Sequence, residues 1–430
     1  MRLFPAIAAA AICVTGTSAL ALDFAVTLNQ ESEYTTNSGL TEEDEVSEWI
    51  HSPGVGLEAS HEGPNLNLDV DYSVNRRLFQ QDLFDDETES AGRANLVWNA
   101  LPERLDFTVN HTRTQTAIRS IGGPTPDNRQ ETTETSAGPT LRFNPRGQDQ
   151  ILLSYLYGDR SADITDTDAT THDTSLSYVL ATSPTNSVAF TLMQNQVQYD
   201  NPFVPDIEYQ IAQVTLVREL SNLDYSLSGG FNRAERSQNR DDVDGVIFEL
   251  QADWQARAST AVSLTIQRDI QDQSTALGAG TFVDDLDFSA DSDLAEVFTN
   301  HQFSVSVEQR LNESTSFTVG ADYLEEDYED IGRDTTRQAL RAALNRNLTP
   351  QLRGSIGFSL ENQDFDDEGE EADTLRGDLR LDYDVGRNLT TAFTVRYEER
   401  DSDAAIATGN YEAWSAIITL SYTLLGGASR

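Results

Sequence analysis

The sequence has 430 residues, and its 72 Asp and Glu against 29 Lys and Arg give a formal net charge of −43 at pH 7. A protein this acidic is repelled by nucleic acid and by anionic membrane surfaces, so neither is expected as a partner. The one cysteine, Cys13, lies near the N-terminus. Disulfides, thiolate metal sites and a cysteine nucleophile are therefore excluded from the rest of the chain, and no cofactor is expected.

Residues 1–21 have the pattern of a secretory signal peptide. Arg2 supplies a positive start, Leu3–Val14 is almost wholly apolar but too short to span a bilayer, and Ala19–Ala21 is a small-x-small cleavage site. We expect export by the Sec route, cleavage after Ala21 and a mature chain of residues 22–430. The first strand should begin within a few residues of Leu22, with no separate plug domain before it.

The dominant pattern of the mature chain is an alternation of apolar and polar residues. It is clear in residues 66–74, where every second residue from Leu66 to Val74 is apolar and those between them are polar. Such alternation predicts a β-strand with one apolar and one polar face. The pattern recurs at residues 105–109, 188–192, 246–254, 262–266, 303–307, 379–383, 393–397 and 414–422.

Two kinds of connection alternate between these segments. Short ones carry Pro, Gly, Asn or Ser, as in Glu62–Asn65 and Asn144–Gly147. Long ones are strongly acidic, as in Thr41–Glu45, Asp82–Glu89 and Glu361–Asp373. Short turns at one end and long loops at the other are the layout of outer-membrane barrels. The sequence therefore predicts an all-β protein: a single antiparallel, transmembrane, up-and-down β-barrel of about 20 strands (18–20), with short periplasmic turns and long acidic extracellular loops.

Two alternatives accompany this prediction. Residues 335–347 fit a strand or an amphipathic helix, and a strand is preferred because its neighbours then pair simply. A soluble β-sandwich or propeller is the competing architecture. Strands of about ten residues or more, longer than most soluble strands, favour the barrel. So do aromatic residues on the apolar face near strand ends, such as Trp98 and Trp254 beside short turns and Trp49 and Trp414 beside long loops.

Motifs in the first 75 residues resemble those of a known family. Glu33-Tyr34-Thr35-Thr36-Asn37 is followed by Ser52-Pro53-Gly54-Val55-Gly56-Leu57, a turn, and a strand with Asp71-Tyr72. In these motifs and in its layout the chain resembles the outer-membrane barrels called "putative β-barrel porin 2", which are associated with exopolysaccharide and PEP-CTERM sorting loci. Thr36 stands where the family usually has Asp. The resemblance implies a role in exopolysaccharide export or surface traffic and names no catalytic residues.

Strand parity predicts which side chains face the barrel interior if the apolar face meets lipid. The predicted inward-facing arginines are Arg337, Arg341, Arg353, Arg376, Arg380, Arg396 and Arg400. The predicted inward-facing acids are Asp69, Asp71, Asp106, Asp378, Asp382 and Asp384. Two interpretations stay open: internal ion pairs that fill the lumen and stiffen the wall, or a charged constriction that orients polar or anionic solutes.

The longest acidic connection runs from about Gln271 to Asp293 and contains Phe282, Leu286 and Phe288. An exposed loop has little use for these apolar side chains. This loop is therefore the predicted constriction loop, folded into the lumen.

No metal or catalytic site is predicted. The five histidines lack metal-ligand spacing, and Asp242–Gly245 comes closest to a calcium loop without completing one. Gly-x-Ser-x-Gly and phosphate-cradling glycine loops are absent. A lipase site would need a serine beside a lipid-facing histidine, and neither His111 nor His301 has one two residues further on.

We therefore expect an outer-membrane channel or conduit, not an enzyme, associated with exopolysaccharide export. Its expected surroundings are outer-membrane lipid and lipopolysaccharide. The barrel-assembly machinery is an expected partner because Ile418–Leu424 resembles the terminal signal that it reads, and polysaccharide or export proteins are further candidates. The alternatives are a structural or anchoring barrel without transport, and a general porin.

Overall fold

The computed structural model describes residues 22–118, 125–145, 147–165, 167–238, 240–272, 296–329, 334–365, 370–403 and 409–426. The predicted signal peptide and the predicted constriction residues Phe282, Leu286 and Phe288 lie outside the described residues. In the part that is described, there is no helix with the length and apolarity needed to cross a bilayer.

The described residues form one sheet of 20 antiparallel strands, in which β1 pairs with both β2 and β20 and so closes a barrel. The predicted all-β barrel and its strand number are confirmed. One short 3₁₀ helix, Pro126–Asn128, precedes β6. The strands are β1 Asp23–Thr35, β2 Glu48–Glu62, β3 Leu66–Phe79, β4 Glu87–Leu101, β5 Leu105–Ala117, β6 Arg129–Phe143, β7 Gln150–Ala162, β8 Ala169–Ser183, β9 Asn186–Tyr199, β10 Ile207–Glu219, β11 Leu223–Arg236, β12 Val243–Arg257, β13 Thr260–Asp272, β14 Val297–Asn312, β15 Thr315–Tyr328, β16 Thr335–Asn347, β17 Leu352–Phe365, β18 Glu370–Asp384, β19 Leu389–Ser402 and β20 Tyr411–Gly426.

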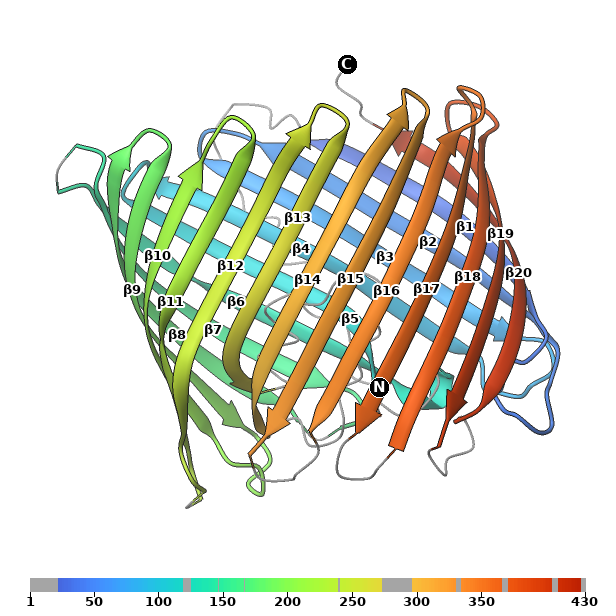
Figure 1. Cartoon of the computed structure of the whole chain (residues 1–430), viewed down its shortest axis with the longest axis horizontal. Coiled ribbons are helices and arrows are strands. Elements are labelled where there is room, and N and C mark those ends of the chain that lie inside the picture. Colours follow the sequence, from blue (N-terminus) through green and yellow to red (C-terminus); the bar gives the residue numbers. More distant parts are fainter. Residues whose placement is uncertain are drawn as a thin grey trace.

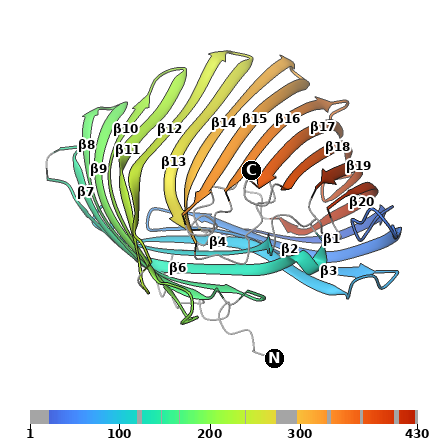
Figure 2. The ribbon, with the colours of Figure 1, turned by 60° about the horizontal axis from the view of Figure 1, so that its bottom comes forward.

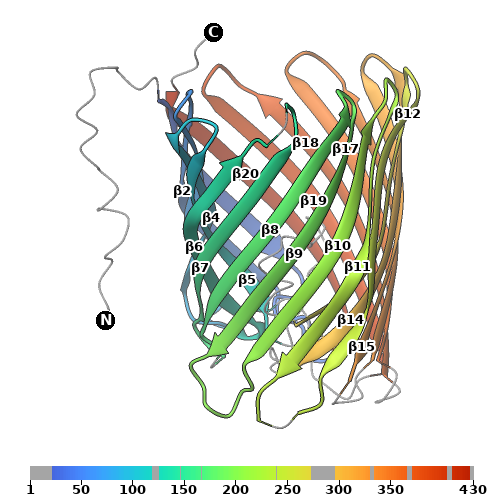
Figure 3. The same ribbon diagram turned by 90° about the vertical axis from the view of Figure 1, so that its left-hand side faces the viewer.

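Each strand pairs with the next one along the chain, which is the up-and-down order. The strands are strongly tilted, and tight hairpin turns gather at one end of the barrel while longer connections gather at the other (Figures 1 and 3). The ambiguous segment 335–347 is the strand β16, in register with β15 and β17 on either side. Pairing from both sides supplies a strand with partners for its backbone groups, which decides against the helix.

The strands reach further into the acidic segments than predicted. The segment Glu361–Asp373 was expected to be a loop, but β17 continues to Phe365 and β18 begins at Glu370. Likewise β15 continues through Glu325 and Glu326 to Tyr328. Acidic side chains are tolerated there because a strand end that stands above the hydrocarbon is bathed in water on its outer face. Composition therefore marks where the apolar belt ends and not where the strand ends.

The lipid-facing side of the wall is identified by its exposed apolar side chains. Leu192, Val246 and Ile356 are 59%, 62% and 54% exposed, respectively, although they lie within strands that are paired on both sides. Large apolar side chains exposed in this way over a whole wall indicate a membrane-facing surface. The face opposite to them encloses the lumen, which Figure 2 shows from its long-loop end.

Substituting a lipid-facing residue by arginine should destabilise the barrel. Val395 lies beside Leu379 and Ala416 of the neighbouring strands on the outer face. We expect Val395→Arg, and Leu381→Arg on the same face, to lower the free energy of unfolding by about 2–4 kcal/mol near mid-membrane. The inward-facing substitutions Asp382→Asn and Thr394→Ser should change it little. Urea unfolding in lipid vesicles measures both sets, and equal effects would contradict the assigned faces.

Candidate functional site

The lumen wall carries most of the predicted site residues. Register places Arg337, Arg341, Arg353, Arg376, Arg380, Arg396 and Arg400 on the face opposite to Leu340, Leu360, Leu375 and Val395, so all seven side chains start from the inner face of β16–β19. By the same criterion, the inner face also holds Asp69, Asp71, Asp106, Asp378, Asp382 and Asp384.

Several of these arginines belong to a ladder of ion pairs that crosses β16–β20. Glu361 of β17 lies 2.8 Å from Arg337 and 3.9 Å from Arg376, measured between side-chain N and O atoms. Arg376 also pairs with Glu398 of β19 at 3.3 Å, and the Tyr411 hydroxyl of β20 donates to Glu398 at 2.6 Å. The side chains of Arg337 and Glu361 are only 7% and 11% exposed. These charges are therefore paired with one another, and the pairs connect the five strands β16–β20 on the inner face.

Other charges of the same wall stay open to the lumen. Arg353 pairs with Asp384 at 3.5 Å and Arg380 with Asp382 at 2.9 Å, but both arginine side chains are about half exposed. Arg396 is exposed and lies in register with Asp378. Exposed charges of this kind contribute little to stability and remain available to act on ions in the lumen.

The inner face of β1–β3 is acidic. It carries Glu31, Glu33, Glu58, Asp69 and Asp71, because these residues alternate with the lipid-facing Leu28, Val55, Leu57, Val70 and Tyr72. Asp69 lies 3.8 Å from the exposed Arg93 of β4. Asp106 of β5 is instead buried and accepts a 2.7 Å hydrogen bond from Arg142 of β6. Asp69 and Asp71 therefore face the lumen as predicted, whereas Asp106 on β5 is held in a contact between β5 and β6.

The acidic wall and the arginine-bearing wall are neighbours on the inner face, because β19 and β1 both pair with β20. Charges of opposite sign on neighbouring parts of the wall of an aqueous channel create a transverse field, and such a field orients dipolar solutes and selects ions. This arrangement is the candidate functional site of the molecule.

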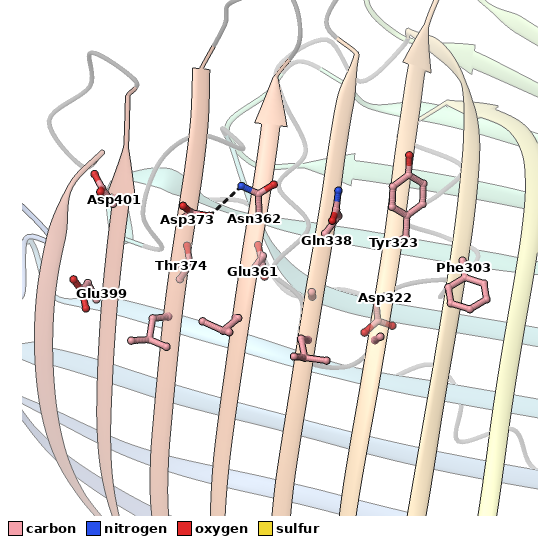
Figure 4. A pocket seen from close by; sticks show the side chains of 15 residues that line it. Phe303, Asp322, Tyr323, Gln338, Glu361, Asn362, Asp373, Thr374, Glu399 and Asp401 are labelled. Atoms are coloured by element: carbon pink, nitrogen blue, oxygen red, sulfur yellow. Dashed lines mark hydrogen bonds between the residues drawn. The ribbon is translucent and has the colours of Figure 1, made fainter.

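The outer surface at the long-loop end is polar and hollowed. A hollow of about 740 Å³ lies over the ends of β14–β19, with Leu340, Leu360 and Leu375 toward the apolar belt. Figure 4 shows polar side chains from successive strands around it, including Gln338 and Glu399, with Asn362 donating to Asp373 at 3.0 Å. Hydrogen-bonding groups at this height mark the boundary between hydrocarbon and head groups.

The structure brings together one serine and histidine pair that strand spacing alone did not reveal. Ser32 Oγ and His51 Nδ1 lie 3.0 Å apart on the outer face of β1 and β2. In the described part of the chain no carboxylate is bonded to His51. The Ser32 position is paired on both sides within its ladders, so no pair of free backbone N–H groups is aimed beside it as an oxyanion hole. This pair therefore lacks the parts of a hydrolase site.

No candidate metal site, meaning three or more grouped His, Cys, Asp or Glu side chains, occurs within the ranges that the structure describes. The residues that sequence analysis missed are acids, above all Glu361 and Glu398. Glu361 was assigned to a loop by composition, although its parity with Ser359 and Ser355 on the inner face was already readable in the sequence.

Comparisons with known proteins agree with this geometry. The family model described as "Putative outer membrane beta-barrel porin, MtrB/PioB" matches residues 162–367, and that described as "Putative beta-barrel porin 2" matches residues 335–423. The second match confirms the resemblance noted above, although it lies at the opposite end of the chain from the motifs that suggested it. The protein is a porin-like outer-membrane β-barrel.

Solved structures with a similar fold include two transporters. The porin-like barrel aligns with the FrpB iron transporter from Neisseria meningitidis at 7% identity and a TM-score of 0.52, over 94% of this chain and 82% of that chain. It aligns with the ferric citrate transporter FecA at 9% identity and a TM-score of 0.50, over 95% and 79% of the two chains. Such low identities show the fold alone. No curated protein matches the sequence.

The ion-pair ladder of the porin-like barrel should be structural. Glu361→Ala would leave Arg337 and Arg376 without a shared acid in a mostly buried position, and we expect a loss of about 3–5 kcal/mol in the free energy of unfolding. Asp382→Asn, in the exposed pair with Arg380, should cost no more than about 1 kcal/mol. Urea denaturation followed by heat-modifiable gel migration measures both. Equal losses would show that burial does not distinguish the two pairs.

Proposed function

We propose that the protein is a passive channel of the outer membrane, and that it serves as a conduit for an exopolysaccharide. The observation that carries the first part is the closed wall of 20 strands around a polar inner face. Barrels of about 16–18 strands already leave an aqueous channel, so a 20-stranded wall encloses enough space for hydrated solutes.

The lumen wall supports a polar solute. Its inward side chains are largely Ser, Thr, Asn, Gln and charged residues, as in Ser73, Asn95 and Thr108, which offer hydrogen bonds to sugar hydroxyls. The acids of β1–β3 and the exposed arginines of β17–β19 would orient a polar chain in transit. The resemblance to barrels associated with exopolysaccharide and PEP-CTERM loci favours a polysaccharide over other polar solutes, and no described residue distinguishes one polysaccharide from another.

A structural barrel is the second candidate, and the ladder from Arg337 to Tyr411 favours it. A wall braced from inside by mutual ion pairs serves an anchoring role as well as a transport role. In that case the barrel would dock a surface assembly without conducting. A general porin is the third candidate, since its lumen needs the same polar lining.

The remaining parts of the proposal concern the surroundings of the barrel. Export through a signal peptide cleaved after Ala21, insertion by the barrel-assembly machinery and contact with lipopolysaccharide are proposed. The polar rim around Asn362 and Asp373 supports the last of these, because it offers hydrogen bonds at the height of lipid head groups. We also propose that the protein is not an enzyme.

Ion selectivity should follow the charge of the lumen walls. In a planar bilayer with a salt gradient, the wild-type channel should prefer cations, because the inner face of β1–β3 carries five acids, whereas each of the three exposed arginines of β17–β19 lies beside an acid of a neighbouring strand or of its own. The double substitution Glu58→Lys and Asp71→Lys should move the reversal potential toward anions. Glu313→Lys, in a short turn outside the lumen, is the matched control. An unchanged reversal potential would show that these acids do not face the conduction path.

The exopolysaccharide role is tested in the cell. Deleting the gene should trap polysaccharide in the periplasm and reduce the extracellular amount, and the wild-type gene should restore it. Normal secretion in the deletion strain, combined with conductance of the purified protein, would favour the general porin. Absence of conductance would favour the structural barrel. Neighbouring genes for glycosyltransferases and polysaccharide export would support the polymer conduit.

A further inference from the structure

The ladder between β12 and β13 stops short of the long-loop end. Its last pair on that side is Phe248 with Arg268. Beyond this pair, β12 continues to Val243 in register with β11 only, and β13 continues to Asp272 in register with β14 only. The two strands therefore diverge, whereas a complete ladder would have joined them over several more residues.

Beyond the divergence, β13 crosses the inner side of β11 and β10. The Asn232 side chain of β11 donates to the Ile270 carbonyl at 2.8 Å, and the Tyr209 hydroxyl of β10 donates to Asp272 at 2.7 Å. Asn232 follows the lipid-facing Phe231, and Tyr209 lies in register with Ala234, so both side chains belong to the inner face. The end of β13 at Asp272 and the start of β14 at Val297, which are in register, consequently lie inside the barrel, and Figure 2 shows β13 ending within the ring of strands.

We call residues 268–272 and 296–300 the inner layer. It lies on an apolar patch of the wall, the seat, formed by the inward-facing Ala169, Val197, Tyr199, Ile207, Tyr209, Ala234 and Val243. Ile270 and Val297 of the inner layer belong to the same cluster and are 2% and 0% exposed. An apolar patch on the inner face of a polar lumen would raise the free energy of the folded protein if water covered it. The inner layer removes this patch from water, and the patch in turn buries Ile270 and Val297.

Where β12 and β13 diverge, side chains replace part of the missing backbone hydrogen bonds between the two strands. Arg268 donates to the backbone carbonyl of Val246, and Asp269 accepts the Ile270 N–H at 2.8 Å. Gly245 leaves room for this crossing, because a Cβ there would lie 3.2 Å from both Arg268 Nη1 and Ile270 Cδ1. Backbone groups in a membrane-embedded wall must find partners, and these side chains provide them.

The ladder between β4 and β5 also stops early, at Gly92 with Arg113, but it is closed by different chemistry. There Arg129 lies 3.4 Å from Glu89, Arg113 pairs with Glu131, and Ser90 donates to Glu131 at 2.8 Å. Ion pairs are weakened by salt, whereas apolar contacts are not. The apolar contact between the inner layer and its seat is therefore the less salt-sensitive of the two closures.

We infer that the inner layer limits the bore of the lumen and sets the size of polar solute that passes. This inference rests on the proposed channel function and adds to it the element that determines specificity. The seat holds the inner layer against the wall of β8–β12 and thereby fixes how much of the cross-section of the lumen this layer occupies.

The test loosens the seat by a charge. Ala234→Asp places a carboxylate under the inner layer, where the wild-type side chain is fully buried. The same strand and face offer the control Ser226→Asp, eight residues nearer the short turns and outside the seat. If the layer lifts, the new carboxylate of Ala234→Asp faces water in the lumen, so the barrel should still fold. Heat-modifiable migration checks this for both variants.

Two readouts separate the seat from the channel. Single-channel conductance and the largest polyethylene glycol that enters the pore should both rise in Ala234→Asp, with conductance increasing about twofold, and stay unchanged in Ser226→Asp. In a background of Val297→Cys, whose site is fully buried, maleimide labelling should become about tenfold faster when Ala234→Asp is added, the factor that about 1.4 kcal/mol of lost protection produces.

The labelling rate and the conductance together test the inference. Faster labelling with a larger bore supports the inference. Faster labelling with unchanged conductance would show that the inner layer does not limit the pore, and unchanged labelling would show that it does not rest on this seat; either result overturns the inference. A wild-type protein that never conducts, with the labelling response intact, would refute the channel function and the limiting role while supporting the seat.

Discussion

The requirement that every backbone polar group find a partner inside the membrane governs this molecule. An isolated sheet would expose one row of N–H and C=O groups at each edge, and lipid offers them nothing. Closure between β1 and β20 removes both edges. Once the wall is closed, the alternation of side chains determines its two surfaces, because successive residues of each strand point in turn to lipid and to the lumen.

The two faces then obey different chemistry. Outside, apolar residues form a belt that gives way to polar side chains at the long-loop end. Inside, charges are tolerated only where they are hydrated or paired. The ladder through Glu361 and Glu398 is the paired case, and the exposed Arg396 of β19 is the hydrated case. One wall therefore combines a structural set of charges with a set that acts on solutes.

Two pairs of neighbouring strands lose their backbone pairing before the strands end. Most ladders run to the ends of their strands, but those of β4–β5 and β12–β13 stop early. Each break is closed by side chains, with ion pairs in the first case and an apolar seat in the second. Where β13 leaves its ladder with β12, its last residues lie against the inner side of β10 and β11.

The sequence by itself determined the fold class, a strand number of 18–20 and the two faces, because a period of two in hydropathy is a local property of each strand. It also assigned the seven arginines of β16–β19 named above to the inner face, since parity needs no knowledge of neighbours. Tertiary structure alone decided which charges pair, because Arg337 meets Glu361 only through the register of β16 and β17. It alone placed Ile270 and Val297 inside the barrel. Their apolar character is visible in the sequence, but the patch that buries them is assembled from residues of β8 to β12, the most distant of which, Ala169, precedes Val297 by 128 residues.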